Sequence, residues 1–404
     1  MRAMRPRVFL HVGSPKTGTT FLQDVLWSQR DTALEQGLLL PGERFNDHFL
    51  ATLDVRGLAH DPVYPERARG MWDRLATEAL AWDGSVLISH ELFAGATAEQ
   101  ARRATATLAE AAEVHVLVTA RDHVRQISAE WQEHVKHRSS ATFGAFIEEV
   151  RTDTARTSWF WQVQDYAGLL ERWGADLPGE QLHVVTVPPS GADPAVLWDR
   201  FAGLLGVDPA AFDTDLQRSN SSLGAEQAEL LRRVNLELGD RLPLPGPYPL
   251  VVKEVLAHKI LEPRAGTRLA LDAQDQEFAA DAARGIADRI AAMGADVVGD
   301  LNDLTDRAPL VGGGPAAGAD PADPYAAPSD VVLLAESVAT IADLLVVLDE
   351  RRGALRRADD LTTTAREKPI RFALVHASEQ RPLLRRLRAA YRAARERLGA
   401  GSDA

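Results

Sequence analysis

The residues best suited to chemistry form one short run near the N-terminus, Gly13-Ser-Pro-Lys-Thr-Gly-Thr-Thr20. The run lies between an apolar segment and an amphipathic one, so we expect it to join a strand to a helix. Unbonded backbone N–H groups at a helix start, together with the helix dipole, bind anions. Lys16 adds a point charge, while Thr17, Thr19 and Thr20 add hydroxyl donors. The run therefore predicts a cradle for a phosphate or a similar anion.

The residue order in this loop differs from that of the phosphate loop of nucleotide triphosphatases and kinases. In those proteins a lysine and a serine or threonine follow the last glycine, and the hydroxyl binds Mg²⁺. Here Lys16 precedes Gly18, and Thr19 and Thr20 follow it. A magnesium-dependent P-loop kinase acting on a small molecule is therefore an alternative that the order disfavours. The chain has no cysteine and no H-E-x-x-H motif, so we expect no catalytic metal.

A second group of polar residues follows the apolar run 114–119. Arg121, Arg125 and Ser128 are spaced so that they converge on one face near the start of a helix. Arginine suits a phosphate monoester because its guanidinium can bind two oxygens at once. The alternative is that these arginines pair with acidic neighbours on a solvated helix face. Those neighbours are Asp122, Glu130 and Glu133.

A candidate general base lies at the end of a third apolar run, 85–89. His90 and Glu91 follow it directly, and either side chain can accept a proton. Adjacent residues on an extended segment point to opposite sides, so only one of the two can face a site at this edge. The residues alone leave the choice open.

The order Pro15-Lys-Thr-Gly-Thr-Thr20 resembles the P-K-[ST]-G-[ST]-[ST] signature of sulfotransferases that use 3'-phosphoadenosine 5'-phosphosulfate (PAPS), including bacterial members. The resemblance covers roughly residues 5–300. It implies transfer of a sulfuryl group from PAPS to a hydroxyl or amine, with 3',5'-adenosine diphosphate as the product and no metal required. The acceptor would be a small molecule or a glycan.

The same resemblance implies residue roles. The loop would hold the 5'-phosphosulfate, Arg121 and Ser128 would grip the 3'-phosphate, and Arg125 is a substitute for the serine. Lys16 would act in catalysis. The base at this strand end is a histidine in some members of the family and a glutamate in others, so Glu91 is favoured slightly and His90 stays open. The loop residues concerned are Ser14, Pro15, Lys16, Thr17, Gly18, Thr19 and Thr20.

Short apolar runs alternate with longer amphipathic segments, as in a parallel sheet covered by helices. The expected strands are 7–12, 85–89, 114–119 and 181–187. The expected helices are 19–36, 66–81, 98–111, 124–136, 141–150, 161–173, 192–205, 225–235 and 276–293. Together with the resemblance, this predicts an α/β fold of three layers, with a mostly parallel central sheet flanked by helices (P-loop NTPase-like) and a C-terminal helical appendage.

Composition changes sharply near the C-terminus. Residues 309–329 are rich in Gly, Ala and Pro and lack periodicity, which is typical of a linker. We therefore expect a sulfotransferase domain over 1–308 and a helical region over 330–404, with helices at 330–357 and 382–398. The apolar stripe of the first helix is suited to packing on the main domain or on another copy.

Bulk properties limit the partners and the location. The net charge of −13 disfavours nucleic-acid binding. The apolar run 8–12 is too short for a signal peptide, and the run 330–348 carries three acidic residues that disfavour a membrane span. We expect a soluble cytoplasmic protein. A non-catalytic nucleotide-binding interaction protein, with the basic segment from Arg381 onward binding an acidic partner, is a further alternative.

Overall fold

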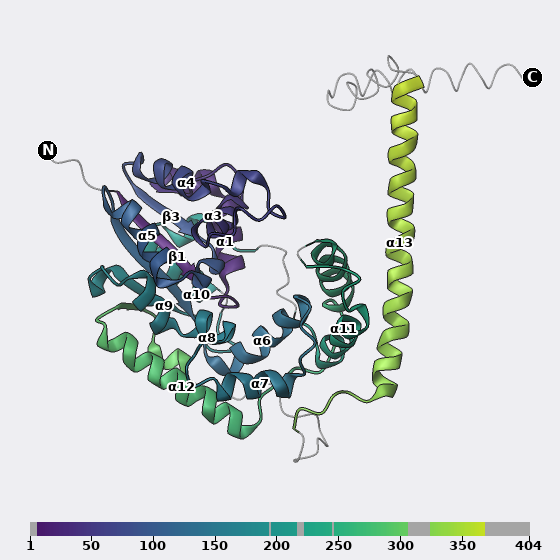
Figure 1. Ribbon diagram of the computed structural model, residues 1–404. Coiled ribbons are helices and arrows are strands. Elements are labelled where there is room, and N and C mark those ends of the chain that lie inside the picture. The colour runs from purple at the N-terminus through teal and green to yellow at the C-terminus, as the bar shows by residue number, and fades with distance from the viewer. Residues whose placement is uncertain (1–5, 194, 216–221, 245, 306–323, 368–404) are drawn as a thin grey trace, which may run out of the picture. The chain divides into compact units, whose positions relative to one another are not determined.

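The computed structural model contains one central sheet with helices on both faces (Figure 1). It describes residues 6–193, 195–215, 222–244, 246–305 and 324–367. The chain divides into two compact units, residues 1–336 and 337–404, and the sheet lies in the first. All strand pairs are parallel, in the order β2-β3-β1-β4-β5-β6. The predicted α/β fold, with a parallel sheet between two layers of helices, is therefore confirmed.

The central strand β1 sets the register of the sheet. His11 lies beside Ser89 of β3 and beside Leu117 of β4, so the carboxyl ends of these three strands meet at one edge. The strands are β1 Arg7–Gly13, β2 Leu38–Leu39, β3 Ser85–Ser89, β4 Glu113–Ala120, β5 Leu182–Thr186 and β6 Asp296–Val298. Apart from their first residues, β1, β3 and β4 are buried throughout, as expected for strands covered on both faces.

Helices cover the sheet on both sides. Phe9 and Leu117 pack against α1 and α10 on one face, while α5 and α9 pack on β4 from the other. The α-helices of the first unit are α1 Thr19–Ser28, α2 Arg30–Glu35, α3 Asp47–Val55, α4 Met71–Leu80, α5 Ala98–Ala109, α6 His123–Lys136, α7 Phe143–Thr152, α8 Trp159–Gln164, α9 Tyr166–Trp173, α10 Ala195–Leu205, α11 Ala225–Leu238 and α12 Ala273–Ala292. The short 3-10 helices are η1 Glu66–Ala68, η2 Glu91–Gly95, η3 Gly179–Gln181, η4 Pro209–Ala211 and η6 Leu301–Leu304, and η5 Pro249–Leu261 is a π-helix.

Each predicted strand is present within one residue of its expected bounds, but three predicted helices are interrupted. The helix expected over 19–36 breaks at Gln29, whose backbone is not helical. The helix expected over 66–81 breaks at Gly70, which has φ 66°. In the segment 161–173 the side chain of Asp165 accepts a hydrogen bond from the Gly168 amide and starts a new helix.

The C-terminal helix is longer than predicted. α13 spans Asp330–Glu367, beyond the expected end at residue 357. The predicted helix 382–398 and most of the predicted linker 309–329 lie outside the described residues, so the domain boundary stays a prediction. Among the described residues, one helix, Asp330–Arg356, is long and apolar enough by length and composition to cross a membrane.

Two fully buried histidines lie under the edge where β1 and β3 end. His11 Nδ1 is 2.8 Å from Ser89 Oγ, and His11 Nε2 is 3.2 Å from Thr119 Oγ1. His48 Nε2 donates to the Pro41 carbonyl at 2.9 Å, and its Nδ1 accepts from the Ser89 amide at 3.2 Å. Burial lowers the pKa of His11 to about 4 and that of His48 to about 4. Both rings are therefore neutral in the folded protein near pH 7.

These two histidines predict a loss of stability in mild acid. In the unfolded chain these two histidines bind protons below their ordinary pKa near 6.5. In the folded chain they stay neutral down to about pH 4. The free energy of unfolding should therefore fall between pH 6.5 and pH 4, by about 3 kcal/mol for each histidine at the lower end. Urea unfolding at a series of pH values measures the fall.

A matched pair of variants separates this effect from general acid unfolding. His48→Gln keeps hydrogen-bonding groups but cannot be protonated, so the stability of this variant should fall less with pH. His60→Gln changes an exposed histidine and should leave the wild-type slope intact. Equal slopes for all three proteins would contradict the assignment.

Candidate active site

The loop between β1 and α1 has the backbone geometry of an anion cradle. Gly18 is the N-cap of α1 with φ 86°, and it has no side chain that could cap the first amides of the helix. Those amides are therefore available to an anion. A Cβ at Gly18 would lie 2.6 Å from Leu197 Cδ2 of α10, so both the left-handed backbone and the close packing favour glycine. Lys16 also adopts a positive φ, 61°.

Buried hydroxyls hold this loop in place. Ser14 Oγ donates to the Val163 carbonyl and lies 3.0 Å from Gln164 Oε1. Thr17 Oγ1 donates to the Ser14 carbonyl and lies 2.5 Å from Thr119 Oγ1, both within the core. Ser14 and Thr17 therefore position the loop between α8 and β4.

The second predicted group comes close to the loop. Arg121 Nη1 donates to the Lys16 carbonyl at 3.1 Å. Burial, and then the charge of Arg125, lower the pKa of Arg121 to about 10, so this arginine is still a cation near pH 7. Arg125 itself is held by its ion pair with Asp122 and by the Pro188 carbonyl. Of the predicted pairing with acidic neighbours, only the Arg125–Asp122 pair is present in the described part of the chain.

Ser128 fits a role in ligand binding for a separate reason. Its Oγ is buried and has no hydrogen-bond partner among the described residues. An unpaired buried hydroxyl costs free energy unless a ligand satisfies it. This hydroxyl lines the same pocket as Arg121 and Arg125.

The two candidate bases take different positions. Glu91 lines the pocket, whereas His90 does not and instead accepts the Leu92 amide hydrogen at 3.2 Å through Nδ1. Burial lowers the pKa of His90, which favours the neutral ring. Burial raises the pKa of Glu91, but His90 and hydrogen bonds from the Glu91 amide and from Gln23 outweigh it, so the carboxylate form is favoured. Of the two candidate bases, Glu91 therefore belongs to the pocket lining and His90 does not.

One pocket of about 1190 Å³ joins these groups. Of the predicted site residues, Ser14 and His90 lie outside its lining. Those that line it are Pro15, Lys16, Thr17, Gly18, Thr19, Thr20, Glu91, Arg121, Arg125 and Ser128. The sheet edge thus brings the loop, the arginines and one carboxylate to a single cavity.

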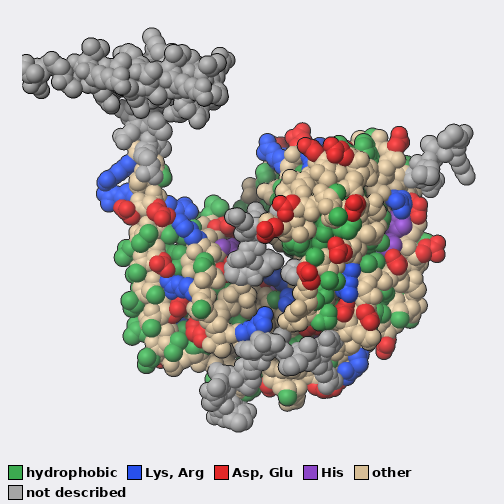
Figure 2. Space-filling view, turned by 180° about the vertical axis from the view of Figure 1, so that it is seen from behind, with side chains coloured by type: hydrophobic (Ala, Val, Ile, Leu, Met, Phe, Trp, Pro, Cys, Tyr) green, Lys and Arg blue, Asp and Glu red, His purple; other side chains and the backbone are tan. Residues whose placement is uncertain are grey.

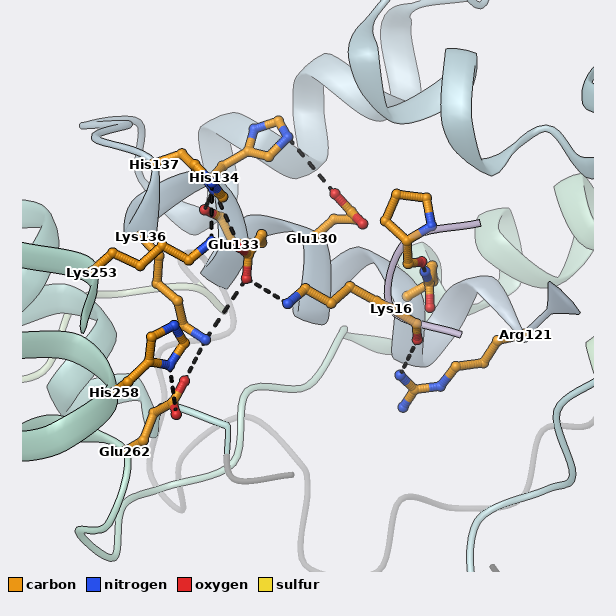
Figure 3. A network of polar contacts seen from close by, with 12 residues as sticks. Lys16, Arg121, Glu130, Glu133, His134, Lys136, His137, Lys253, His258 and Glu262 are labelled. Carbon is orange, nitrogen blue, oxygen red and sulfur yellow. Dashed lines mark hydrogen bonds and ion pairs between the residues drawn. The ribbon is translucent and has the colours of Figure 1, made fainter. Parts of the chain in front are cut away.

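Lys16 is held by a carboxylate that the sequence pattern did not single out for this site. Its Nζ lies 2.5 Å from Glu133 Oε2 of α6, and Figure 3 shows the two side chains pointing toward each other. Glu133 also lies 2.7 Å from Lys253 Nζ of η5 and 3.8 Å from Lys136 Nζ. Burial lowers the pKa of Lys16, but the charge of Glu133 outweighs it and the pKa lies above its ordinary value. Burial raises the pKa of Glu133, but the charges of Lys16, Lys253 and Lys136 outweigh burial, so the pKa lies well below its ordinary value.

Glu130 is a second carboxyl on the same side of α6. It is buried and accepts a hydrogen bond from Gln164 Nε2 at 3.0 Å. Burial raises the pKa of Glu130 to about 7, opposed by the charge of Lys16. Gln164 also contacts Ser14 and donates to the Pro15 carbonyl at 3.2 Å, so Glu130 is linked to the loop through one side chain.

Part of this site carried a sequence signal and part did not. Glu130 and Glu133 are three residues apart on α6 and so share one face of the helix, but the sequence offers them only as alternative partners of Arg121 and Arg125. Lys253 lies on η5, a segment in which the sequence analysis predicts no helix. Only the folded chain brings it beside Glu133.

Comparisons with known proteins give little beyond this geometry. No family model and no curated protein matches the chain. Among solved structures, the chain is similar to a sulfotransferase from Alicyclobacillus acidocaldarius, with 18% sequence identity and a TM-score of 0.35. The alignment covers 52% of this chain and 86% of that one. A likeness of this degree carries no argument about activity.

The cluster around Glu133 predicts a cost for removing its charge. Glu133→Gln leaves Lys16, Lys136 and Lys253 without this carboxylate, so we expect a loss of about 2–4 kcal/mol in the free energy of unfolding, since the cluster is only partly shielded from water. Denaturant unfolding without added anions measures it. Glu148→Gln, which breaks an exposed pair with Arg151, should cost about 0.5 kcal/mol or less. Equal stability of the two variants would contradict the prediction.

Proposed function

We propose that this protein is a sulfotransferase that moves a sulfuryl group from PAPS to a hydroxyl or amine of an acceptor. The observation that carries the proposal is the single pocket that joins the Lys16 loop, the half-buried Arg121, the buried Ser128 and the carboxylate of Glu91. A sulfuryl donor with two phosphate groups needs two anion sites, and the acceptor needs a base. All three kinds of group face this cavity.

The two anion sites differ in ways that fit the two ends of the donor. The loop offers backbone amides at the start of α1, together with the Lys16 ammonium, for the 5'-phosphosulfate. Arg121 and the unpaired hydroxyl of Ser128 would hold the 3'-phosphate. Arg121 bonds to the carbonyl of Lys16, so the two sites are coupled through one residue.

Sulfuryl transfer requires from the protein a base for the acceptor proton and a cation near the leaving phosphate. The donor supplies an activated sulfuryl group whose S–O bond to the phosphate breaks as a new bond forms between sulfur and the acceptor. Glu91 would take the acceptor proton, and Lys16 would stabilise the charge that develops on the leaving phosphate. Before it can do so, Lys16 must exchange its contact with Glu133 for a contact with the donor.

Nucleotide binding tests the donor assignment. We expect 3',5'-adenosine diphosphate to raise the melting temperature without magnesium, and to do so more than adenosine 5'-monophosphate because of the 3'-phosphate. Arg121→Ala should remove most of that difference, weakening 3',5'-adenosine diphosphate by about tenfold to a hundredfold. Arg151→Ala, at an arginine on the surface of α7, should change neither ligand. Stabilisation by ATP that requires magnesium, without a response to 3',5'-adenosine diphosphate, would favour the kinase and overturn the assignment.

Transfer itself is tested with a library of acceptors incubated with PAPS, with mass spectrometry used to find products heavier by one sulfuryl group. Lys16→Ala should abolish product formation with the fold intact. Glu91→Gln should lower kcat by about two to four orders of magnitude, because the amide cannot accept the proton. His90→Gln should retain most of the activity. The reverse ranking of the last two variants would assign the base to His90 instead.

A further inference from the structure

The exposed side of α13 carries a seven-residue repeat that the proposed function does not use. Apolar residues recur at spacings of three and four, the a and d positions of a heptad. The a positions are Val331, Val338, Leu345 and Arg352, and the d positions are Leu334, Ile341, Leu348 and Leu355. Spacings of three and four residues alternate along this line, so the pattern has a mean period of 3.5 residues and not the 3.6 of a straight helix.

These apolar side chains are exposed to a degree that is unusual for their size. The exposed fractions are 79% for Val331, 65% for Leu334, 60% for Val338, 57% for Ile341, 62% for Leu345, 61% for Leu348 and 71% for Leu355. Figure 2 shows hydrophobic side chains along most of this helix. An apolar strip of this length on a single chain marks an interaction surface.

Charged residues keep the same register as the apolar ones. Glu336, Asp343 and Glu350 each occupy the f position, which lies farthest from the seam of a coiled coil. A helix evolved to face lipid has no reason to repeat an acid every seven residues. The acidic residues therefore form one line along the helix opposite the seam, and apolar residues such as Val332 and Val346 lie beside this line at the b positions.

The start of α13 is also tied to the first unit by ion pairs. Asp330 lies 2.9 Å from Arg233, and Glu336 lies 2.5 Å from Arg264. If these two turns stay with the first unit, the apolar stretch 337–348 that follows spans only about 18 Å at the rise of an α-helix. This is well short of the hydrocarbon core of a bilayer, about 30 Å. On this geometry the free part of the candidate span Asp330–Arg356 is too short to cross a bilayer, which favours a protein-binding surface.

We propose that the seam formed by these a and d residues binds the same seam of a second copy of this chain, in an antiparallel coiled coil. Each seam side chain offers on the order of 100 Å² of apolar area. Seven of them approach the ~800 Å² per partner of a standard-size interface. Aligned in parallel, Arg351, Arg352 and Arg356 of the two copies would meet one another. An antiparallel pairing separates them and places Ile341 of one copy against Leu345 of the other.

Two neighbouring residues provide a matched test of the seam. Leu345 at position a and Val346 at position b are similarly exposed, 62% and 59%, but only the first faces the proposed partner. We expect the full chain to be a dimer in sedimentation velocity, Leu345→Glu to weaken it by at least about tenfold, and Val346→Glu to leave it a dimer. Circular dichroism of each variant checks that the helix is retained. A monomeric wild-type protein, or equal effects of the two variants, would overturn the proposal.

The absence of cysteine from the sequence makes the orientation testable by cross-linking. A mixture of Ile341→Cys and Leu345→Cys chains should form disulfide-linked dimers on oxidation, and a mixture of Ile341→Cys and Val346→Cys chains should not. Efficient cross-linking of Leu345→Cys alone would overturn the antiparallel arrangement. Sedimentation of the wild-type chain with phosphatidylcholine vesicles would overturn the seam and favour a membrane segment.

Discussion

β1 pairs in parallel with β3 on one side and with β4 on the other, so three strands end at the same edge of the sheet. The residues that follow those strands are the phosphate-type loop, the His90–Glu91 pair and Arg121. Because parallel strands share one direction, the adjacency of β3, β1 and β4 places these three segments side by side at their carboxyl ends. The pairing of β1 therefore brings these polar groups together, and carboxylates from a flanking helix set the electrostatic environment of Lys16.

Helix α6 provides a carboxylate that stabilises a cation at this edge of the sheet. Lys16 and Arg121 are partly removed from water, which is costly for a charged group without a counter-charge. Glu133 supplies one for Lys16, and Glu130 on the same face titrates near neutral pH because it is buried. An incoming anion would take over a role that a side chain already fills. In a chain with net charge −13, an anion site would depend on such a local arrangement of cations.

The sequence predicted the elements that depend on local pattern. The strands β1, β3, β4 and β5 are short, apolar and followed by polar residues. The residue order of the loop from Gly13 to Thr20 indicates anion binding without a structure. The short strands β2 and β6 have only two and three residues and give no pattern. Helix breaks at Gln29 and Asp165 depend on backbone geometry and capping inside segments of helical composition, so periodicity missed them.

The charged part of the site could not be predicted in the same way. The partner of Lys16 is more than a hundred residues away in sequence, at Glu133, and Lys253 is on a π-helix with almost no amphipathic pattern. A salt bridge between distant elements produces no recognisable pattern in the sequence of either segment. The choice between His90 and Glu91 is of the same kind, because it rests on which side chain the turn after β3 directs into the pocket.

The contact between Gly18 and Leu197 constrains how this site can change. Two independent barriers keep a side chain out of position 18, the left-handed backbone and the nearby methyl group of Leu197. Shortening Leu197 would relieve only the second barrier. Substitution at position 18 should therefore stay costly even when Leu197 is shortened, while position 197 can vary toward smaller residues at the cost of packing alone. Helix α10 thus limits the size of the residue at position 18 through the Leu197 methyl group, without a described polar contact to the predicted site residues.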